Sequence, residues 1–189
     1  MASRQFWEEQ FEGSANSPLA WRRSAHELIT AANIVRRSIE AGDREQREHW
    51  TGRTEVVVTS AHRPAAPAMM LYAFAVENLA KAVLIACGTK ATEKMRLAKT
   101  LNTHDLIALV KAIGLSIDGE TNQLLQRMTR FISSGRYPVL THPHPVEFGD
   151  GIAIPQDFNC ALTLLQRLDD ALRLAAPGED IGTRNLREL

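Results

Sequence analysis

The chain has 189 residues, 22 Lys and Arg against 22 Asp and Glu, and a hydrophobic fraction of 44%. This length and composition are typical of one globular domain with a core of its own. The balanced charge excludes a global field that attracts nucleic acid or an anionic membrane, so a basic binding surface has to be local. The two cysteines, Cys87 and Cys160, cannot form a disulfide framework or a cysteine-based zinc site, and we expect both to be small core residues.

The first 16 residues are polar apart from Phe6, Trp7 and Phe11. These aromatics allow a short helix that docks on the body, and a partly ordered arm is the alternative that chain ends favour. The stretch contains acidic residues and no continuous apolar region, so it does not read as a signal peptide, and a cytoplasmic location is the default expectation. We therefore expect an N-terminal arm over residues 1–16.

Ser17-Pro18 predicts the start of the first main helix, with Ser as the N-cap and Pro at the first helical position. Apolar residues recur at helical spacing from there to Gly42, where we expect the helix to end. Residues 43–66 are expected to be a connector with a β-branched run. Four arginines off the apolar stripe indicate either the solvated side of the helix or a local basic face, and the solvated side is the favoured interpretation: Arg22, Arg23, Arg36 and Arg37.

Residues 67–87 are apolar on nearly every face, apart from Glu77, Asn78 and Lys81. Such a helix either spans a membrane or forms the centre of a bundle. Charged residues at mid-span cost about 2.5–3.5 kcal/mol each on the insertion scale, which argues against a span. We expect a buried central helix that carries an internal Glu77–Lys81 pair and ends before Gly88.

A basic stretch follows Gly88, and a short helix is one possibility there. Asn102 or Thr103 is expected to cap the next helix, which ends at Gly114. His104 and Asp105 would lie in its first turn, where Asp105 complements the helix dipole.

A further helix is expected from about Asp118 to Gly135, and the last from about Pro155 to Ala175. The segment between them is rich in proline and predicts a loop. The fold class is therefore all-α, a five-helix up-and-down bundle over residues 17–176 with a Pro-rich loop before its last helix and a flexible tail over residues 177–189.

Three motifs occur in order on this helical pattern: AVENLAKAVLIACG, then HDLIALV, then FISSGRYPV. Together they resemble the HEPN family of small helical bundles, which often carry a Glu and a Lys four residues apart, a His-Asp-Leu helix start and an Arg-Tyr-Pro after the fourth helix. The resemblance covers about residues 17–176. It implies a HEPN-like bundle in which two protomers commonly bring their motifs together, so a homodimer is expected.

Many HEPN domains resemble metal-independent ribonucleases of toxin–antitoxin and phage-defence systems, with an Arg, four to six residues, and then a His. Here Arg136 and His142 have five residues between them. The resemblance implies that His142 is the general acid or base and that Arg136 holds the phosphate. This chain departs from the nuclease pattern at Tyr137, where Asn, Asp or His is common. His144 stands where some of these toxins carry a tyrosine, so nucleotidylation at that position is not supported.

Two functions stay open on the sequence. One is the ribonuclease; the other is a non-catalytic module for dimerisation or for binding a nucleotide, RNA, or a nucleotidyltransferase or antitoxin partner. In either case Arg136 could instead cap the end of a helix. We expect Glu77 to approach Arg136 or His104, and its cluster to be mainly structural. No cofactor or membrane contact is expected. A metal site is not expected either, because His104, His142 and His144 lack a clear further zinc ligand.

Overall fold

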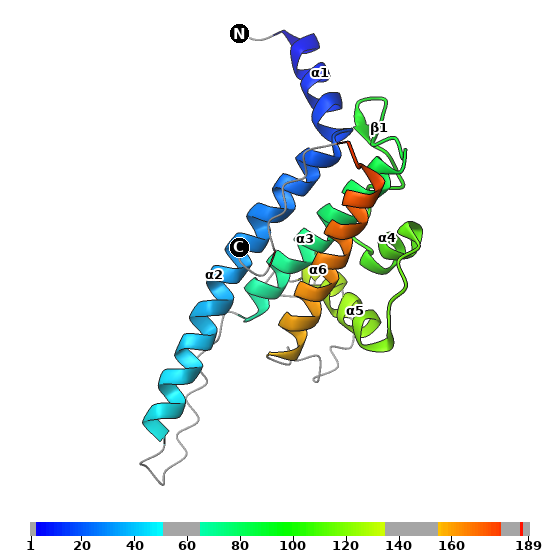
Figure 1. Ribbon diagram of the computed structural model, residues 1–189. Coiled ribbons are helices and arrows are strands. Elements are labelled where there is room, and N and C mark those ends of the chain that lie inside the picture. The colour runs from blue at the N-terminus through cyan, green and yellow to red at the C-terminus, as the bar shows by residue number, and fades with distance from the viewer. Residues whose placement is uncertain (1–2, 51–64, 135–154, 179–185, 187–189) are drawn as a thin grey trace.

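The computed structural model describes residues 3–50, 65–134, 155–178 and 186. Within these ranges the fold is a bundle of six helices with one short hairpin (Figure 1). The helices are α1 (Arg4–Ala15), α2 (Pro18–Trp50), α3 (Ala65–Ala86), α4 (Leu106–Ile113), α5 (Gly119–Ser134) and α6 (Gln156–Ala175), and the strands are β1 (Thr92–Glu93) and β2 (Arg96–Leu97). The predicted all-α character is confirmed.

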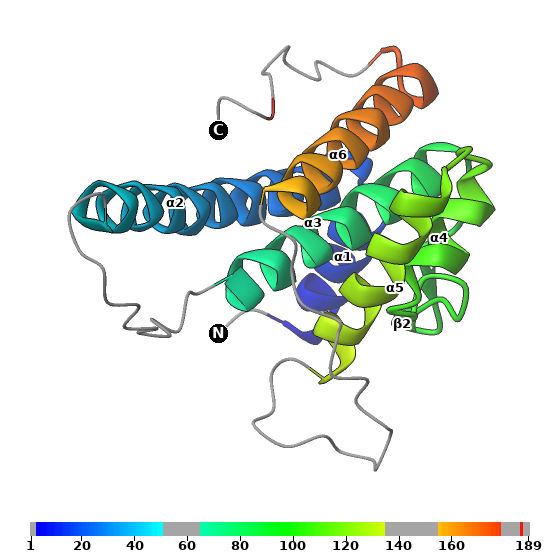
Figure 2. The ribbon, with the colours of Figure 1, turned by 90° about the horizontal axis from the view of Figure 1, so that it is seen from below.

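The central position expected for the apolar helix is confirmed by α3. It packs against α2, α4, α5 and α6 (Figures 1 and 2). By length and composition α3 could cross a membrane, yet 72% of its most apolar window is buried inside the fold. Tyr72, Val76, Leu79 and Ala80 are fully buried on it. Helices α2, α4, α5 and α6 thus supply the apolar surroundings that a lone helix of this composition requires, as in the core of a soluble protein.

The ends of α3 and α4 follow the local sequence signals, with one shift at the start of α4. Gly88 and Gly114 end α3 and α4 in the left-handed conformation, with φ of 93° and 77°. The amide of Thr89 donates to the carbonyl of Leu84, which closes the end of α3 in a Schellman motif. The N-cap of α4 is Asp105, whose carboxylate accepts from the amide of Ala108 at 3.0 Å. The cap expected at Asn102 or Thr103 is therefore wrong, because α4 begins only at Leu106.

Helix α2 continues beyond Gly42, where the sequence predicted its end. A glycine inside a helix costs only about 1 kcal/mol relative to alanine. Several of the residues that follow it are strong helix formers, among them Arg44, Glu45 and Gln46. The connector expected over residues 43–66 thus begins as helix, and its β-branched run lies outside the described residues.

The basic stretch after Gly88 forms a β-hairpin rather than the short helix that the sequence suggested. Its strands pair antiparallel, with Thr92 opposite Leu97 and Glu93 opposite Arg96. Ala91, Thr92 and Ala98 are buried against the bundle end. Tertiary burial of the small residues at its base overrides the helix propensity of the lysines around them.

The exposure of several side chains bears on three further expectations: aromatics of the N-terminal arm that dock on the body, two core cysteines and a flexible tail. The aromatics of α1 do not dock on the body: Phe6, Trp7 and Phe11 remain 44%, 63% and 39% exposed, and Ala15 is the buried residue of this helix. Cys87 is exposed, so the expectation of a core residue is wrong there, whereas Cys160 is half-buried and packs against the core. Cys87 comes directly after the last residue of α3, beyond the packed part of that helix. Of the tail that we expected to be flexible, the structure describes residues 177, 178 and 186, and Leu186 is buried against the core.

Candidate functional site

The predicted cluster on α3 is built around Glu77, whose side chain is buried. One of its carboxylate oxygens accepts from Lys81 Nζ at 2.5 Å, one helical turn further along. The other oxygen lies 2.9 Å from His104 Nδ1, which comes from the segment before α4. The expectation that Glu77 approaches His104 is thus confirmed, and the first two motifs of the resemblance meet at this carboxylate.

Lys81 is enclosed on two sides. Its side chain is only 4% exposed, and Nζ lies 5.5 Å from the centroid of the Trp21 ring on α2. The Trp21 indole is held in turn by donating to the carbonyl of Ala15 at 2.8 Å. A buried ammonium needs both a counter-charge and further contacts to offset its desolvation, and Glu77 and Trp21 provide these. Lys81 is therefore a fixed structural cation rather than a solvent-facing ligand.

His104 is the accessible member of the cluster, because its side chain is 52% exposed. A carboxylate only accepts hydrogen bonds, so the contact with Glu77 assigns the proton to Nδ1 and leaves Nε2 as an acceptor in the neutral ring. A carboxylate that fixes an imidazole tautomer is the arrangement that orients a histidine for proton transfer or for ligand binding. The centre is thus a buried ion pair with one exposed, oriented imidazole.

Two predicted site residues point elsewhere. Asn78 donates to Ser24 Oγ at 3.2 Å and so joins α3 to α2 instead of joining the Glu77 cluster. Asp105 caps α4, as described above. The amide of Leu106 donates to Thr129 Oγ1 at 3.3 Å, which ties the start of α4 to α5. These contacts fix the frame around His104 but present no free group to a ligand.

The remaining predicted site residues lie outside the described part of the chain: Arg136, Tyr137, His142 and His144. Helix α5 ends at Ser134, two residues before Arg136. Across the residues that the structure does describe, no three His, Cys, Asp or Glu side chains gather in a way that could hold a metal ion.

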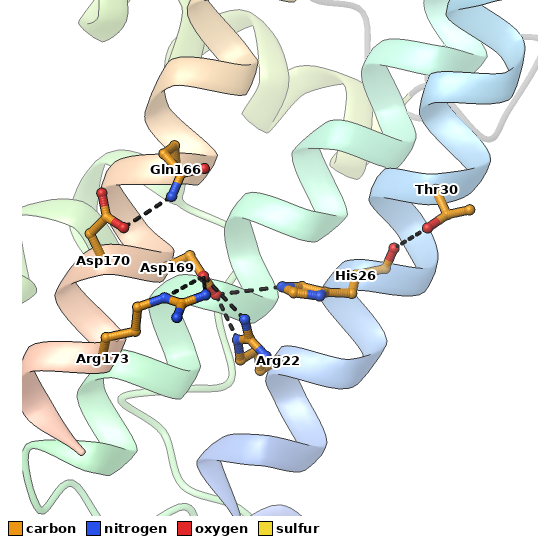
Figure 3. Close-up of polar contacts among 7 residues, drawn as sticks. All are labelled: Arg22, His26, Thr30, Gln166, Asp169, Asp170 and Arg173. Atoms are coloured by element: carbon orange, nitrogen blue, oxygen red, sulfur yellow. Dashed lines mark hydrogen bonds and ion pairs between the residues drawn. The ribbon is translucent and has the colours of Figure 1, made fainter. Parts of the chain in front are cut away.

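A second charged cluster, which sequence reasoning missed, joins α2 to α6 (Figure 3). Asp169 is fully buried and accepts from three side chains. Arg22 Nε donates to it at 2.6 Å, Arg173 Nη2 at 3.0 Å, and His26 Nε2 lies at 3.4 Å. Burial opposes ionisation of Asp169, but the hydrogen bonds from His26 and Arg22 and the charge of Arg22 hold its pKa well below its ordinary value.

This cluster corrects the interpretation of Arg22 as part of a solvated face, since its side chain is 12% exposed. The sequence of α6 contained a sign of this cluster. Asp169 stands four residues after Leu165 and three before Leu172, so it falls on the predicted buried stripe. A carboxylate on such a stripe requires a cationic partner. With two guanidinium groups around one carboxylate, we interpret the cluster as a joint between helices.

A third buried polar contact lies deeper in the bundle. Tyr72 donates its hydroxyl hydrogen to Asn33 Oδ1 at 2.6 Å, and Asn33 Nδ2 donates to the carbonyl of Leu186 at 3.4 Å. Burial raises the pKa of Tyr72, so its hydroxyl stays protonated at neutral pH. This contact joins α2, α3 and Leu186 and leaves no group exposed for chemistry.

Comparisons of the chain with protein-family models, with known proteins and with solved structures find no match. The support for a function is therefore the order of the sequence motifs and the contacts at Glu77.

Proposed function

We propose that the chain is a HEPN-like protein that acts as a metal-independent endoribonuclease of a toxin–antitoxin or phage-defence system. The observation that carries the proposal is the contact between Glu77 and His104. It joins two of the three motifs on which the resemblance rests, although 27 residues separate them. The third motif begins at the end of α5, the helix to which the start of α4 is bonded.

In the proposed reaction Arg136 and His142 carry the chemistry. A histidine takes the proton from an RNA 2′-hydroxyl, and the 2′-oxygen attacks the adjacent phosphorus. Arg136 stabilises the charge that develops on the phosphate oxygens. The bond from phosphorus to the 5′-oxygen then breaks as that oxygen receives a proton, which leaves a 2′,3′-cyclic phosphate and a 5′-hydroxyl. His142 serves as the base or as the acid, and a second protomer supplies the other in a homodimer.

The second candidate is a non-catalytic module that dimerises and binds a nucleotide, RNA, or a nucleotidyltransferase or antitoxin partner. The fully satisfied Glu77–Lys81 pair favours it, because this pair and the Asp105 cap have sufficient structural roles without any catalysis. In this alternative Arg136 follows the end of α5 as a helix-terminal cation.

The test is cleavage of a labelled mixed-sequence RNA in excess EDTA. We expect the wild-type protein to cleave it, and Arg136→Ala and His142→Ala each to lower the rate by about 100-fold or more. Arg23→Ala, which removes an exposed arginine from α2, is the matched control and should keep the wild-type rate. A substrate with a 2′-deoxy sugar at the cleaved position should resist the enzyme.

Circular dichroism would establish that each variant is folded. Equal cleavage by the wild type and both variants would indicate a contaminating nuclease, and no cleavage by any of them would transfer the assignment to the binding module.

A further inference from the structure

The hairpin between α3 and α4 carries a concentration of positive charge in a chain whose total charge is balanced. Residues 90–99 present four exposed cations against a single acidic residue, Glu93. The cations are Lys90, Lys94, Arg96 and Lys99. Within the described part of the chain, none of the four forms an ion pair or a side-chain hydrogen bond. Their charge is therefore free to attract an acidic surface.

The base of this hairpin is held firmly. The amide of Ala91 donates to Asn16 Oδ1 at 2.9 Å, and Asn16 Nδ2 donates to Thr92 Oγ1 at 3.1 Å. Asn16 is the C-cap of α1, so one residue ties the hairpin to the end of that helix. In Figure 1 α1 and the hairpin lie at the same end of the molecule. The four cations are thus displayed from a fixed platform.

The tip of the hairpin is formed by residues that rarely adopt its backbone conformation. Lys94 and Met95 have φ of 49° and 60°, the left-handed values that a two-residue turn of type I′ requires. Asn-Gly is the usual occupant of such a turn, and non-glycine residues adopt it at an energetic cost. The turn places a cation and a methionine that is 37% exposed at the outermost point of the platform.

Helix α1 is acidic and carries exposed aromatic rings, so its surface is complementary to the basic hairpin. It carries three glutamates against one arginine, and Phe6, Trp7 and Phe11 are exposed on it. Scattered exposed apolar residues are ordinary, but three aromatics within six residues form a patch that indicates an interaction surface. Phe6 and Trp7 also contact each other edge to face, with ring centroids 5.3 Å apart. The hairpin of the same molecule leaves these rings exposed, since α1 meets it at Asn16, the far end of the helix.

We propose that α1 of one copy packs on the hairpin of a second copy, in a symmetric dimer with two identical contacts. Each contact pairs the glutamates and aromatic rings of one α1 with the cations and Met95 of the other hairpin. A two-fold axis repeats the contact, because both surfaces lie at one end of each molecule. This inference rests on the proposed function in one respect: it assigns a contact surface to the homodimer that the proposed function expects.

A charge exchange tests this interface. Glu9→Lys with Glu12→Lys makes α1 basic, and Lys94→Glu with Arg96→Glu makes the hairpin acidic. Each double variant alone brings like charges together in both contacts, so we expect its dimer dissociation constant to rise about 100-fold or more in analytical ultracentrifugation. In an equimolar mixture of the two, both contacts of the heterodimer are complementary again, and we expect dimers to return.

Circular dichroism of each double variant establishes that both are folded, so a mixture that stays monomeric cannot be attributed to unfolding. Arg23→Glu with Arg37→Glu reverses two exposed arginines on α2 and is the charge-matched control, which should dimerise like the wild type. For the apolar part, Trp7→Ala should weaken the dimer about tenfold or more, and Leu174→Ala on α6, where the side chain is 83% exposed, should not.

Three outcomes would overturn the proposal: a wild-type chain that is monomeric at micromolar concentration, variants that dimerise like the wild type, or a mixture that stays monomeric. Loss of RNA binding by the hairpin variant with an unchanged dimer would also overturn it, and would assign the cations to a phosphate backbone. Cleavage of RNA by Arg136→Ala at the wild-type rate, with an intact dimer, would overturn the nuclease chemistry alone, so the two proposals fail separately.

Discussion

Among single residues, Glu77 has the largest structural role in the candidate site. Both Lys81 and His104 contact its carboxylate, and the side chain of Lys81 is slightly more buried than its own, at 4% against 7% exposed. Removing one member of a buried pair leaves the other charge without compensation, which costs more than the pair contributes. The ion pair and the exposed imidazole therefore depend on the same side chain.

We expect Glu77→Ala to lower the free energy of unfolding by about 3–5 kcal/mol, because Lys81 would remain buried without a carboxylate. The double variant Glu77→Ala with Lys81→Met removes both charges and should recover a large part of this loss. Urea denaturation followed by circular dichroism measures both values. If the double variant were as unstable as the single one, an unpaired Lys81 charge would not be the cause.

At the scale of elements, Asp169 controls the joint between α2 and α6. The pKa of its carboxyl is lower in the folded chain than its ordinary value of 3.8. Ionisation of Asp169 therefore stabilises the fold at any pH above about 4, and this stabilisation is lost as the pH falls from about 4 towards the lowered pKa. Asp169→Asn should cost roughly 3–5 kcal/mol near neutral pH, where Arg22 and Arg173 keep their charges without the carboxylate.

The measurement is the free energy of unfolding between pH 7 and pH 2 for the wild type and for Asp169→Asn. The difference between them should be constant above about pH 5 and should shrink on acidification below about pH 4. Asp170→Asn provides the neighbouring control, since Asp170 is exposed and accepts from Gln166 in its own helix. An undiminished difference at pH 2 would show that the joint depends on shape rather than on the charge of Asp169.

The same elements show what the sequence could predict. Apolar periodicity and the stop signals at Gly88 and Gly114 predicted most of the helices, because their causes are local. The buried position of Glu77 was predicted as well, and His104 was one of the two partners expected for it. The hairpin and the Asp169 joint were not, since both depend on contacts between segments far apart in the chain. Asn16 holds the hairpin from 75 residues away, and Arg22 meets Asp169 across 147 residues.

For the whole molecule, α3 determines whether this sequence forms a packed bundle. Leu79 is fully buried on it, whereas Leu84 on the same helix is only partly buried. If α3 is the packed core, Leu79→Ala should create a cavity and lower the free energy of unfolding by about 2–5 kcal/mol. Leu84→Ala should cost clearly less, because part of that side chain is already in water.

Denaturant unfolding of the two variants in detergent-free buffer makes this comparison. In a lipid-exposed helix, by contrast, the surroundings of Leu79 and Leu84 would be equally apolar, and the two truncations would have similar effects. Equal losses of stability in the two variants would thus contradict the packing of α3 inside the bundle. A loss concentrated at Leu79 would show that α3 is packed among α2, α4, α5 and α6, because only a side chain enclosed by these helices leaves a cavity when it is truncated.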